Sequence, residues 1–141
     1  MAISFHNEGI SFQLKEKKRH KRWIGNTIAS HKKHTGQIAF IFTSNEQLLL
    51  MNREFLNHNY FTDVITFDYS GEGILSGDIY ISVEQVFLNA DDYGSETYDE
   101  LRRVMIHGVL HLAGYRDGTA EERKKMRKLE NEALNLWLKT V

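Results

Sequence analysis

The chain has 141 residues, of which 41% are hydrophobic and 26% charged, and this length and balance predict a single globular domain over residues 1–141. The formal net charge of −1 gives no overall positive field that would by itself indicate a nucleic-acid-binding or membrane-surface protein. The chain has no cysteine, which excludes disulfide bonds and cysteine-based zinc sites.

The first third of the sequence predicts a strand, a helix and a second strand. Residues 3–12 fit an edge strand broken at Gly9, and a helix is predicted over about residues 14–31. Residues 37–42, Gln-Ile-Ala-Phe-Ile-Phe, are too apolar for a strand with one face in water, which predicts a central strand. The helix is expected to direct three apolar side chains inward, Trp23, Ile24 and Ile28.

The middle of the chain predicts a helix followed by a hairpin. Ser44, with Gln47 three residues later, fits a capping box. Residues 63–69 and 78–82 are rich in β-branched and aromatic residues, and residues 71–73, Gly-Glu-Gly, suit a turn between them. The helix after Ser44 has apolar residues at helical spacing, Leu48, Met51 and Phe55.

Three further helix starts follow, each marked by a hydroxyl residue and by Glu or Gln three residues later. They are predicted at residues 82–85, 97–100 and 119–122. The first of these helices has apolar residues at Val86, Leu88 and Ala90. The last has an apolar stripe formed by Met126, Leu129, Ala133 and Trp137.

The order of these elements is strand, helix, strand, helix, two strands and then helices. It predicts an α+β domain in which a small mixed four-stranded sheet packs with about five helices. The helix that begins near residue 97 is expected to lie on the sheet through five small or apolar residues at intervals of three and four, Leu101, Val104, Met105, Gly108 and Leu112.

The same helix carries a candidate metal site. His107 and His111 are four residues apart and therefore lie on one helix face. Gly114 follows where a helix can end in a left-handed residue, so the chain can turn back and bring Asp117 toward both imidazoles. Two imidazoles and one carboxylate form a three-ligand set for a divalent metal, with zinc favoured, and leave one position for water.

Gly108 separates this site from the zinc proteases of similar spacing. Those enzymes have Glu directly after the first histidine, where it acts as general base. Gly108 occupies that position here, which argues against peptide hydrolysis by that mechanism. The glycine has two open explanations, close packing of the helix against another backbone and room beside the metal.

Three blocks of the sequence resemble the YbeY family of bacterial ribosomal RNA maturation factors. Residues 107–115 match the family signature His-Gly-x-Leu-His-Leu-x-Gly-Tyr. Residues 62–67, Thr-Asp-Val-Ile-Thr-Phe, resemble the family block Thr-Asp-Val-Leu-Ser-Phe, and residues 77–82 are similar to its Gly-Asp-Ile block. The blocks occur in the family order, which makes the resemblance specific.

The resemblance implies a zinc-dependent, single-strand-specific endoribonuclease. His107, His111 and Asp117 would be its metal ligands and catalytic residues. Family members act in 3′-end maturation of the small-subunit ribosomal RNA and in ribosome quality control, which implies ribosomal RNA, single-stranded RNA and the small ribosomal subunit as partners. The alternatives are a metalloprotease-like zinc hydrolase and a non-catalytic ribosome-binding factor with a structural metal.

The resemblance and the composition agree on a cytoplasmic protein with no membrane partner. No apolar stretch approaches the ~20 residues of a transmembrane helix, and residues 1–5 lack the layout of a signal peptide.

The sequence departs from the family pattern at two places. Asp117 replaces the third histidine of the family, with Arg116 before it, and this carboxylate should make a metal-bound water less acidic and widen selectivity toward ions such as manganese. Leu56 replaces an arginine that is a natural candidate for binding phosphate. The candidates to supply that charge are Arg53, His58 and Arg116.

Several further residues are candidates for supporting roles. Asp63 and Asp78 are candidates to orient the ligand imidazoles, or else are simple turn and strand-start residues. Tyr60 and Phe61 are candidates for base stacking, although ordinary packing is the favoured interpretation. Basic residues that either bind phosphates or form solvated helix faces lie within residues 15–34 and at Lys124, Lys125, Arg127 and Lys128, and residues 84–100 are acidic.

Overall fold

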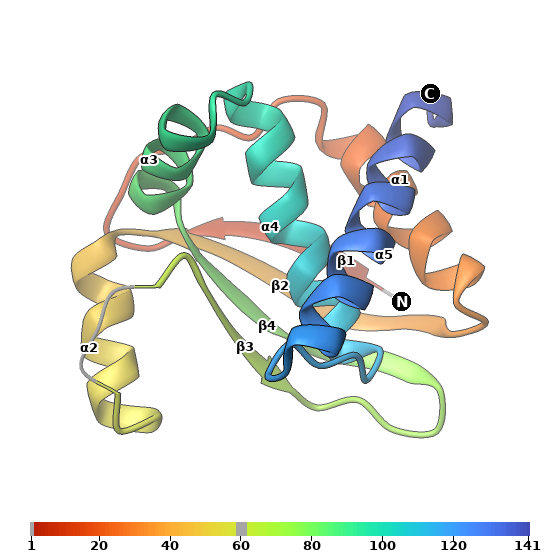
Figure 1. The fold of residues 1–141 in the computed structure, drawn as a ribbon, viewed down its shortest axis with the longest axis horizontal. Coiled ribbons are helices and arrows are strands. Elements are labelled where there is room, and N and C mark those ends of the chain that lie inside the picture. Colours follow the sequence, from red (N-terminus) through yellow and green to blue (C-terminus); the bar gives the residue numbers. More distant parts are fainter. Residues whose placement is uncertain (1, 59–61) are drawn as a thin grey trace.

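The computed structural model describes residues 2–58 and 62–141 and contains five helices and a four-stranded sheet within them (Figure 1). In chain order the elements are β1 (Ala2–Asn7), α1 (Lys17–Ser30), β2 (His34–Thr43), α2 (Asn45–Phe55), β3 (Val64–Asp68), β4 (Ile74–Ser82), α3 (Val83–Tyr93), α4 (Thr97–Leu112) and α5 (Ala120–Lys139). This architecture confirms the predicted α+β fold.

The sheet is mixed and has the strand order β1-β2-β4-β3. Strands β1, β2 and β4 are parallel, while β3 and β4 form an antiparallel hairpin. Strand β2 is interior, as its apolar sequence predicts. Strand β1 is an edge strand that ends at Asn7, before Gly9. In the predicted hairpin turn, Glu72 and Gly73 both have positive φ, which is typical of a type I′ turn.

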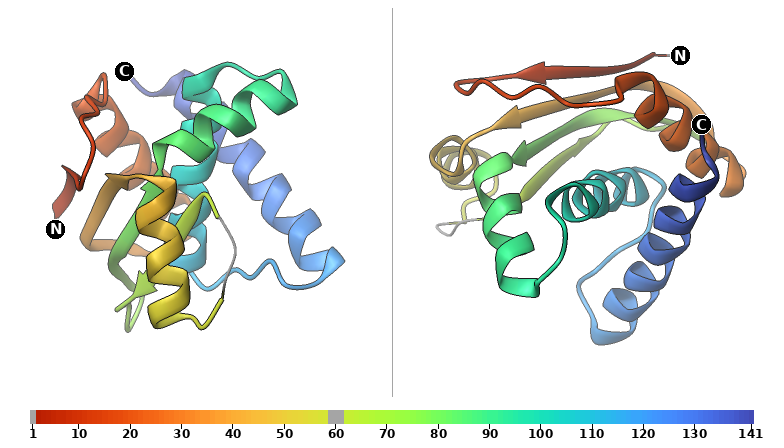
Figure 2. Two further views of the ribbon diagram at one scale, coloured as in Figure 1. Left: turned by 90° about the vertical axis from the view of Figure 1, so that its left-hand side faces the viewer. Right: turned by 90° about the horizontal axis from the view of Figure 1, so that it is seen from above.

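Helix α4 lies against one face of the sheet, with α3 on one side of it and α5 on the other (Figures 1 and 2). Ile79 of β4 is fully buried in the main core with residues of α4 and α5. Tyr80, the next residue, packs instead with Leu48 and Met51 of α2. Because side chains alternate across a strand, α2 covers the opposite face of the sheet.

Gly108 is one of the points at which α4 packs closely against the sheet. A Cβ atom at this position would lie 2.8 Å from Cγ2 of Ile79, a distance that side chains do not tolerate without movement. The structure therefore favours close packing as the reason for glycine here, although the neighbour is the Ile79 side chain and not another backbone. This contact sets the height of α4, and so of its histidines, above β4.

Most predicted helix starts are confirmed, because each depends on residues three apart. The hydroxyl groups of Ser44, Ser82 and Thr119 accept hydrogen bonds from the backbone N–H three residues later. The prediction for Thr97 is wrong by one residue. Glu96 is the N-cap of α4, and its carboxylate accepts a hydrogen bond from the N–H of Asp99 at 3.0 Å.

The predicted inward residues of α1 and α5 are buried, but two apolar residues of α2 and α3 are not. Phe55 is exposed because it lies in the last turn of α2, although it still contacts Phe67 of β3. Leu88 is exposed because it is about 200° around the helix from Val86. In the part of the chain that the structure describes, none of the helices combines the length and apolar character needed to span a bilayer.

Candidate metal centre

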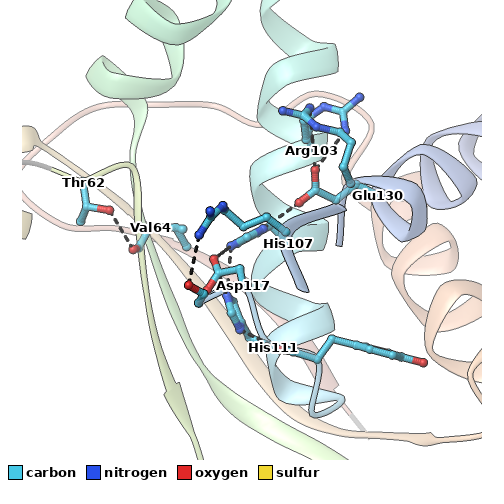
Figure 3. A network of polar contacts seen from close by, with 11 residues as sticks. Thr62, Val64, Arg103, His107, His111, Asp117 and Glu130 are labelled. Carbon is cyan, nitrogen blue, oxygen red and sulfur yellow. Dashed lines mark hydrogen bonds and ion pairs between the residues drawn. The ribbon is translucent and has the colours of Figure 1, made fainter. Parts of the chain in front are cut away.

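The three predicted ligands converge at the end of α4, as Figure 3 shows. Nε2 of His107 lies 3.0 Å from Nε2 of His111. Oδ2 of Asp117 lies 3.2 Å from the first of these nitrogens and 3.3 Å from the second. One oxygen and two nitrogens therefore form a nearly equilateral triangle. The side chains of His107, His111 and Asp117 are 21%, 28% and 43% exposed.

This triangle has the size that a tetrahedral zinc ion requires. Ligand atoms about 2.0–2.1 Å from zinc at tetrahedral angles lie about 3.3–3.4 Å apart. The donor set of two imidazoles and one carboxylate also matches catalytic zinc sites. The partly exposed triangle leaves room for a further ligand from solvent. The residues therefore fit a divalent metal with three protein ligands.

The sequence after α4 places Asp117 by a common helix-ending structure. The N–H of Gly114 donates to the carbonyl of His111, and the N–H of Tyr115 donates to the carbonyl of Leu110. Gly114 has φ +99°. These are the two hydrogen bonds of a Schellman motif, in which glycine takes the left-handed position. The motif reverses the chain, so that Asp117 points back at the helix that it follows.

Both imidazoles are held so that Nε2 faces the centre of the triangle. The carbonyl oxygen of Tyr115 lies 2.9 Å from Nδ1 of His111. Because a carbonyl can only accept, Nδ1 of His111 donates, and the neutral ring has its lone pair on Nε2. A carboxylate oxygen of Glu130 lies 2.7 Å from Nδ1 of His107 and fixes that ring in the same way.

Glu130 is the functional residue that the sequence analysis missed. It lies in α5, buried between His107 and Arg103, and its second oxygen accepts a hydrogen bond from Arg103 at 3.0 Å. Burial opposes charge on both partners. Even so, the hydrogen bond and the opposite charge raise the pKa of His107 above its ordinary value and lower that of Glu130.

One signal in the sequence could have identified Glu130. It lies four residues after Met126 and next to Leu129, on the inward stripe of α5. A carboxylate in such a stripe needs a buried partner, and the histidines of α4 were available. The prediction required knowing that α5 packs beside α4.

The two aspartates proposed to orient the imidazoles do not do so. Asp78 points to the other face of the sheet from Ile79, where Tyr69 donates to it at 3.4 Å. Asp63 accepts a hydrogen bond from Asn89 of α3 at 3.1 Å. Burial raises the pKa of Asp63, and the nearby His107 partly offsets this increase.

Two grooves meet at the candidate metal site. The first has a volume of about 490 Å³ and lies between the β3 side of the sheet and the end of α4. Its lining includes Leu56 and His58 beside the three ligands. The second has a volume of about 310 Å³ and lies among α3, α4 and α5.

Further candidate RNA contacts are Arg116 and the two aromatic residues before Thr62. Arg116 is exposed and is not among the residues that line the two grooves. Tyr60 and Phe61, the stacking candidates, lie outside the described residues.

Comparisons with known proteins found similar sequences over nearly the whole chain. A family model described as endoribonuclease YbeY matches residues 3–137. Endoribonuclease YbeY of Bacteroides thetaiotaomicron is 45% identical over 134 residues, which cover 95% of this chain and 98% of that protein. The protein of the same name from Flavobacterium psychrophilum is 45% identical over 135 residues and covers 96% of each chain.

A solved structure shows the same fold. The solution structure of TM1509 from Thermotoga maritima is similar with a TM-score of 0.68 and 26% sequence identity. The match covers 96% of this chain and 89% of that one.

Proposed function

The chain belongs to the endoribonuclease YbeY family, and we propose that it cleaves single-stranded RNA at the site formed by His107, His111 and Asp117. The observation that carries this proposal is the triangle of ligand atoms, with sides of 3.0, 3.2 and 3.3 Å. Among the described residues, these three side chains form the one group that could hold a metal ion. The family signature lies in the same segment of the chain.

The chemistry of the site suits hydrolysis of a phosphodiester bond. A zinc ion held by the three residues would polarise a phosphoryl oxygen and lower the pKa of a water molecule. The protein itself holds both Nε2 atoms toward the reaction centre through Glu130 and Tyr115. Since the ligand side chains are partly exposed, a flexible strand of RNA can reach them from solvent.

Zinc is the proposed metal, with other divalent ions as alternatives because of Asp117. A carboxylate accepts harder ions more readily than an imidazole does. We expect the single domain over residues 1–141 to bind one ion, at the one group of three ligands among the described residues. Metal analysis of the purified wild-type protein, of Asp117→His and of Asp117→Ala tests this assignment. Unchanged metal content in Asp117→Ala would show that Asp117 is not a ligand.

The proposed substrate is the 3′ end of the small-subunit ribosomal RNA, with the small ribosomal subunit as partner and the cytoplasm as location. The family resemblance supports this role. Peptide hydrolysis is disfavoured, because Ile79 fills the space that a side chain at position 108 would need. A glutamate that acts as general base therefore cannot be placed there without moving the buried side chain of Ile79.

The proposal is tested with an RNA that carries the precursor 3′ end of the small-subunit ribosomal RNA. We expect the wild-type protein to cleave it in its single-stranded part, and His111→Ala to abolish cleavage. His34→Ala is the matched control, since His34 is exposed on β2. Cleavage that survives both His111→Ala and a chelator would refute the proposal. Bound metal without cleavage would favour the non-catalytic ribosome-binding alternative.

A further inference from the structure

The groove among α3, α4 and α5 continues directly from the metal ligands. His107 and Asp117 line it together with Asp63 and Val64, and the same four residues also line the first groove. A strand of RNA whose scissile phosphate lies at the ligands would therefore enter by one groove and leave by the other. The two grooves differ in the charges that they offer to the flanking phosphates.

The α3–α5 groove contains three arginines, and two of them are available to a ligand. Arg103 donates to Glu130 and Asn131 and is committed to the support of His107. Arg123 and Arg127 lie four residues apart on α5, so they share one helix face.

The contacts of these two arginines leave most of their donors unused. Arg123 is exposed and donates from one nitrogen to the carbonyl of Gly118 at 3.1 Å. Arg127 is 61% exposed and lies 4.0 Å from Glu130. A guanidinium has five N–H donors, so each can still bind an anion through two parallel hydrogen bonds.

The first groove offers less positive charge. Among the described residues that line it there is no arginine or lysine, and His58 is its one basic side chain besides the ligands. Leu56, at the position of the family arginine, is part of this lining. Among the described residues that line the two grooves, every arginine therefore belongs to the α3–α5 groove.

Four carboxyl groups also line the α3–α5 groove. Asp117 is a proposed metal ligand, and Glu130 is bound to His107 and Arg103. The other two are less exposed than Arg123 and Arg127. Glu100 is buried in α4, and Asp63 is half-buried beside Asn89. Burial raises the pKa of both carboxyl groups. The arginines, in contrast, are exposed on α5, where a phosphate can bind without leaving water.

We propose that Arg123 and Arg127 form a subsite for the phosphates of the RNA segment on one side of the scissile bond. This inference rests on the proposed endoribonuclease function and places the strand along α5. The planar guanidinium matches phosphate geometry better than an ammonium does, so the two arginines would hold successive phosphates in defined positions. They take the role left open by Leu56.

The test compares two double variants of α5. Arg123→Gln with Arg127→Gln removes the proposed subsite. Lys124→Gln with Lys128→Gln removes the same charge at the same spacing from exposed positions about 100° around the helix. Binding of a fluorescently labelled single-stranded RNA is measured by anisotropy over a range of salt concentrations, and cleavage of the same RNA is measured in parallel.

We expect the arginine variant to weaken RNA binding about tenfold relative to wild type, as two exposed charge contacts should. The salt dependence should fall by roughly 1.4 in the log–log slope, at about 0.7 for each phosphate on a single strand. The lysine variant should change both values much less. In cleavage, KM should rise in the arginine variant while kcat stays within about twofold of wild type.

RNA length gives a second readout. If the RNA is shortened on the side that occupies the α3–α5 groove, the defect of the arginine variant should disappear, whereas shortening on the other side should leave it. Equal defects in the arginine and lysine variants, or a defect that is independent of RNA length, would overturn the inference. If the wild type binds RNA without cleaving it, the proposed endoribonuclease function fails. The arginine subsite is then still tested by comparing RNA binding of the two double variants.

Stability is checked by thermal unfolding of each variant. If the glutamine pair unfolds, Arg123→Lys with Arg127→Lys keeps the charge and removes the bidentate geometry. Partial loss of RNA affinity in this folded variant would support the subsite, and wild-type affinity would contradict it.

Discussion

The substitution Glu130→Gln tests whether α5 tunes the metal site. Glu130 is 7% exposed in its side chain and accepts hydrogen bonds from His107 at 2.7 Å and from Arg103 at 3.0 Å. Glutamine keeps the shape and one acceptor but removes the negative charge. Loss of a carboxylate that supports a ligand histidine typically weakens metal binding 10–100-fold, which corresponds to about 1.4–2.7 kcal/mol.

The assay is competition for zinc between the protein and a chromophoric chelator at about pH 8.5, where an ordinary imidazole is neutral. Glu132→Gln is the matched control, because Glu132 is exposed on the same helix. We expect the control to bind zinc as the wild type does. The metal-free Glu130→Gln protein should also lose about 1–3 kcal/mol of unfolding free energy, because Arg103 loses a charged partner.

Two results would refute this reasoning. Wild-type zinc affinity in Glu130→Gln would show that the negative charge of Glu130 does not tune His107 as a ligand. An equal loss in Glu132→Gln would show that the charge of α5 as a whole matters, and not the contact at 2.7 Å.

Three other predictions concern the core that holds the site in place. Gly108→Ala should lower the unfolding free energy by about 1–3 kcal/mol in urea titrations, because its Cβ meets Ile79; stabilisation would show that α4 can move. Trp23→Phe should cost about 0.5–1.5 kcal/mol for its buried hydrogen bond to Ala133, plus a cavity term, in the same assay. Burial lowers the pKa of His20 in the folded protein. The unfolded chain therefore takes up a proton at this residue at a higher pH than the folded chain does. The free energy of unfolding should fall as the pH drops below about 6.5. His20→Phe should flatten that decline, and an unchanged pH profile would contradict the assignment.

The local parts of this structure were predictable because they depend on residues close in sequence. The caps at Ser44, Ser82 and Thr119 need only the N–H three residues later. The histidine pair needs only one helical turn. Thr97 failed as a cap because Glu96, directly before it, can also reach the free N–H groups of the first turn. A choice between adjacent caps depends on how the preceding loop enters the helix.

The remaining parts depend on packing between elements far apart in sequence. Glu130 lies 23 residues after His107 and becomes its partner only when α5 packs beside α4. Asp78 has the residue type of a group that orients a ligand histidine, but it lies on the wrong face of the strand. Because Ile79 belongs to the core, alternation directs Asp78 away from α4. The direction of Asp78 therefore follows from the sequence, whereas the contact of Glu130 with His107 depends on how α5 packs.

The two departures from the family pattern change the charge of the site in the same direction. Asp117 adds a negative charge where the pattern has histidine, and Leu56 removes a positive charge where it has arginine. Both should weaken attraction for a phosphate. We expect Arg123 to compensate from the first turns of α5. Its guanidinium donates to the carbonyl of Gly118, directly after Asp117, and so is tied to the segment that carries the third ligand. A change in Asp117 therefore also bears on the position of Arg123, and metal affinity and RNA affinity should be coupled through this short segment.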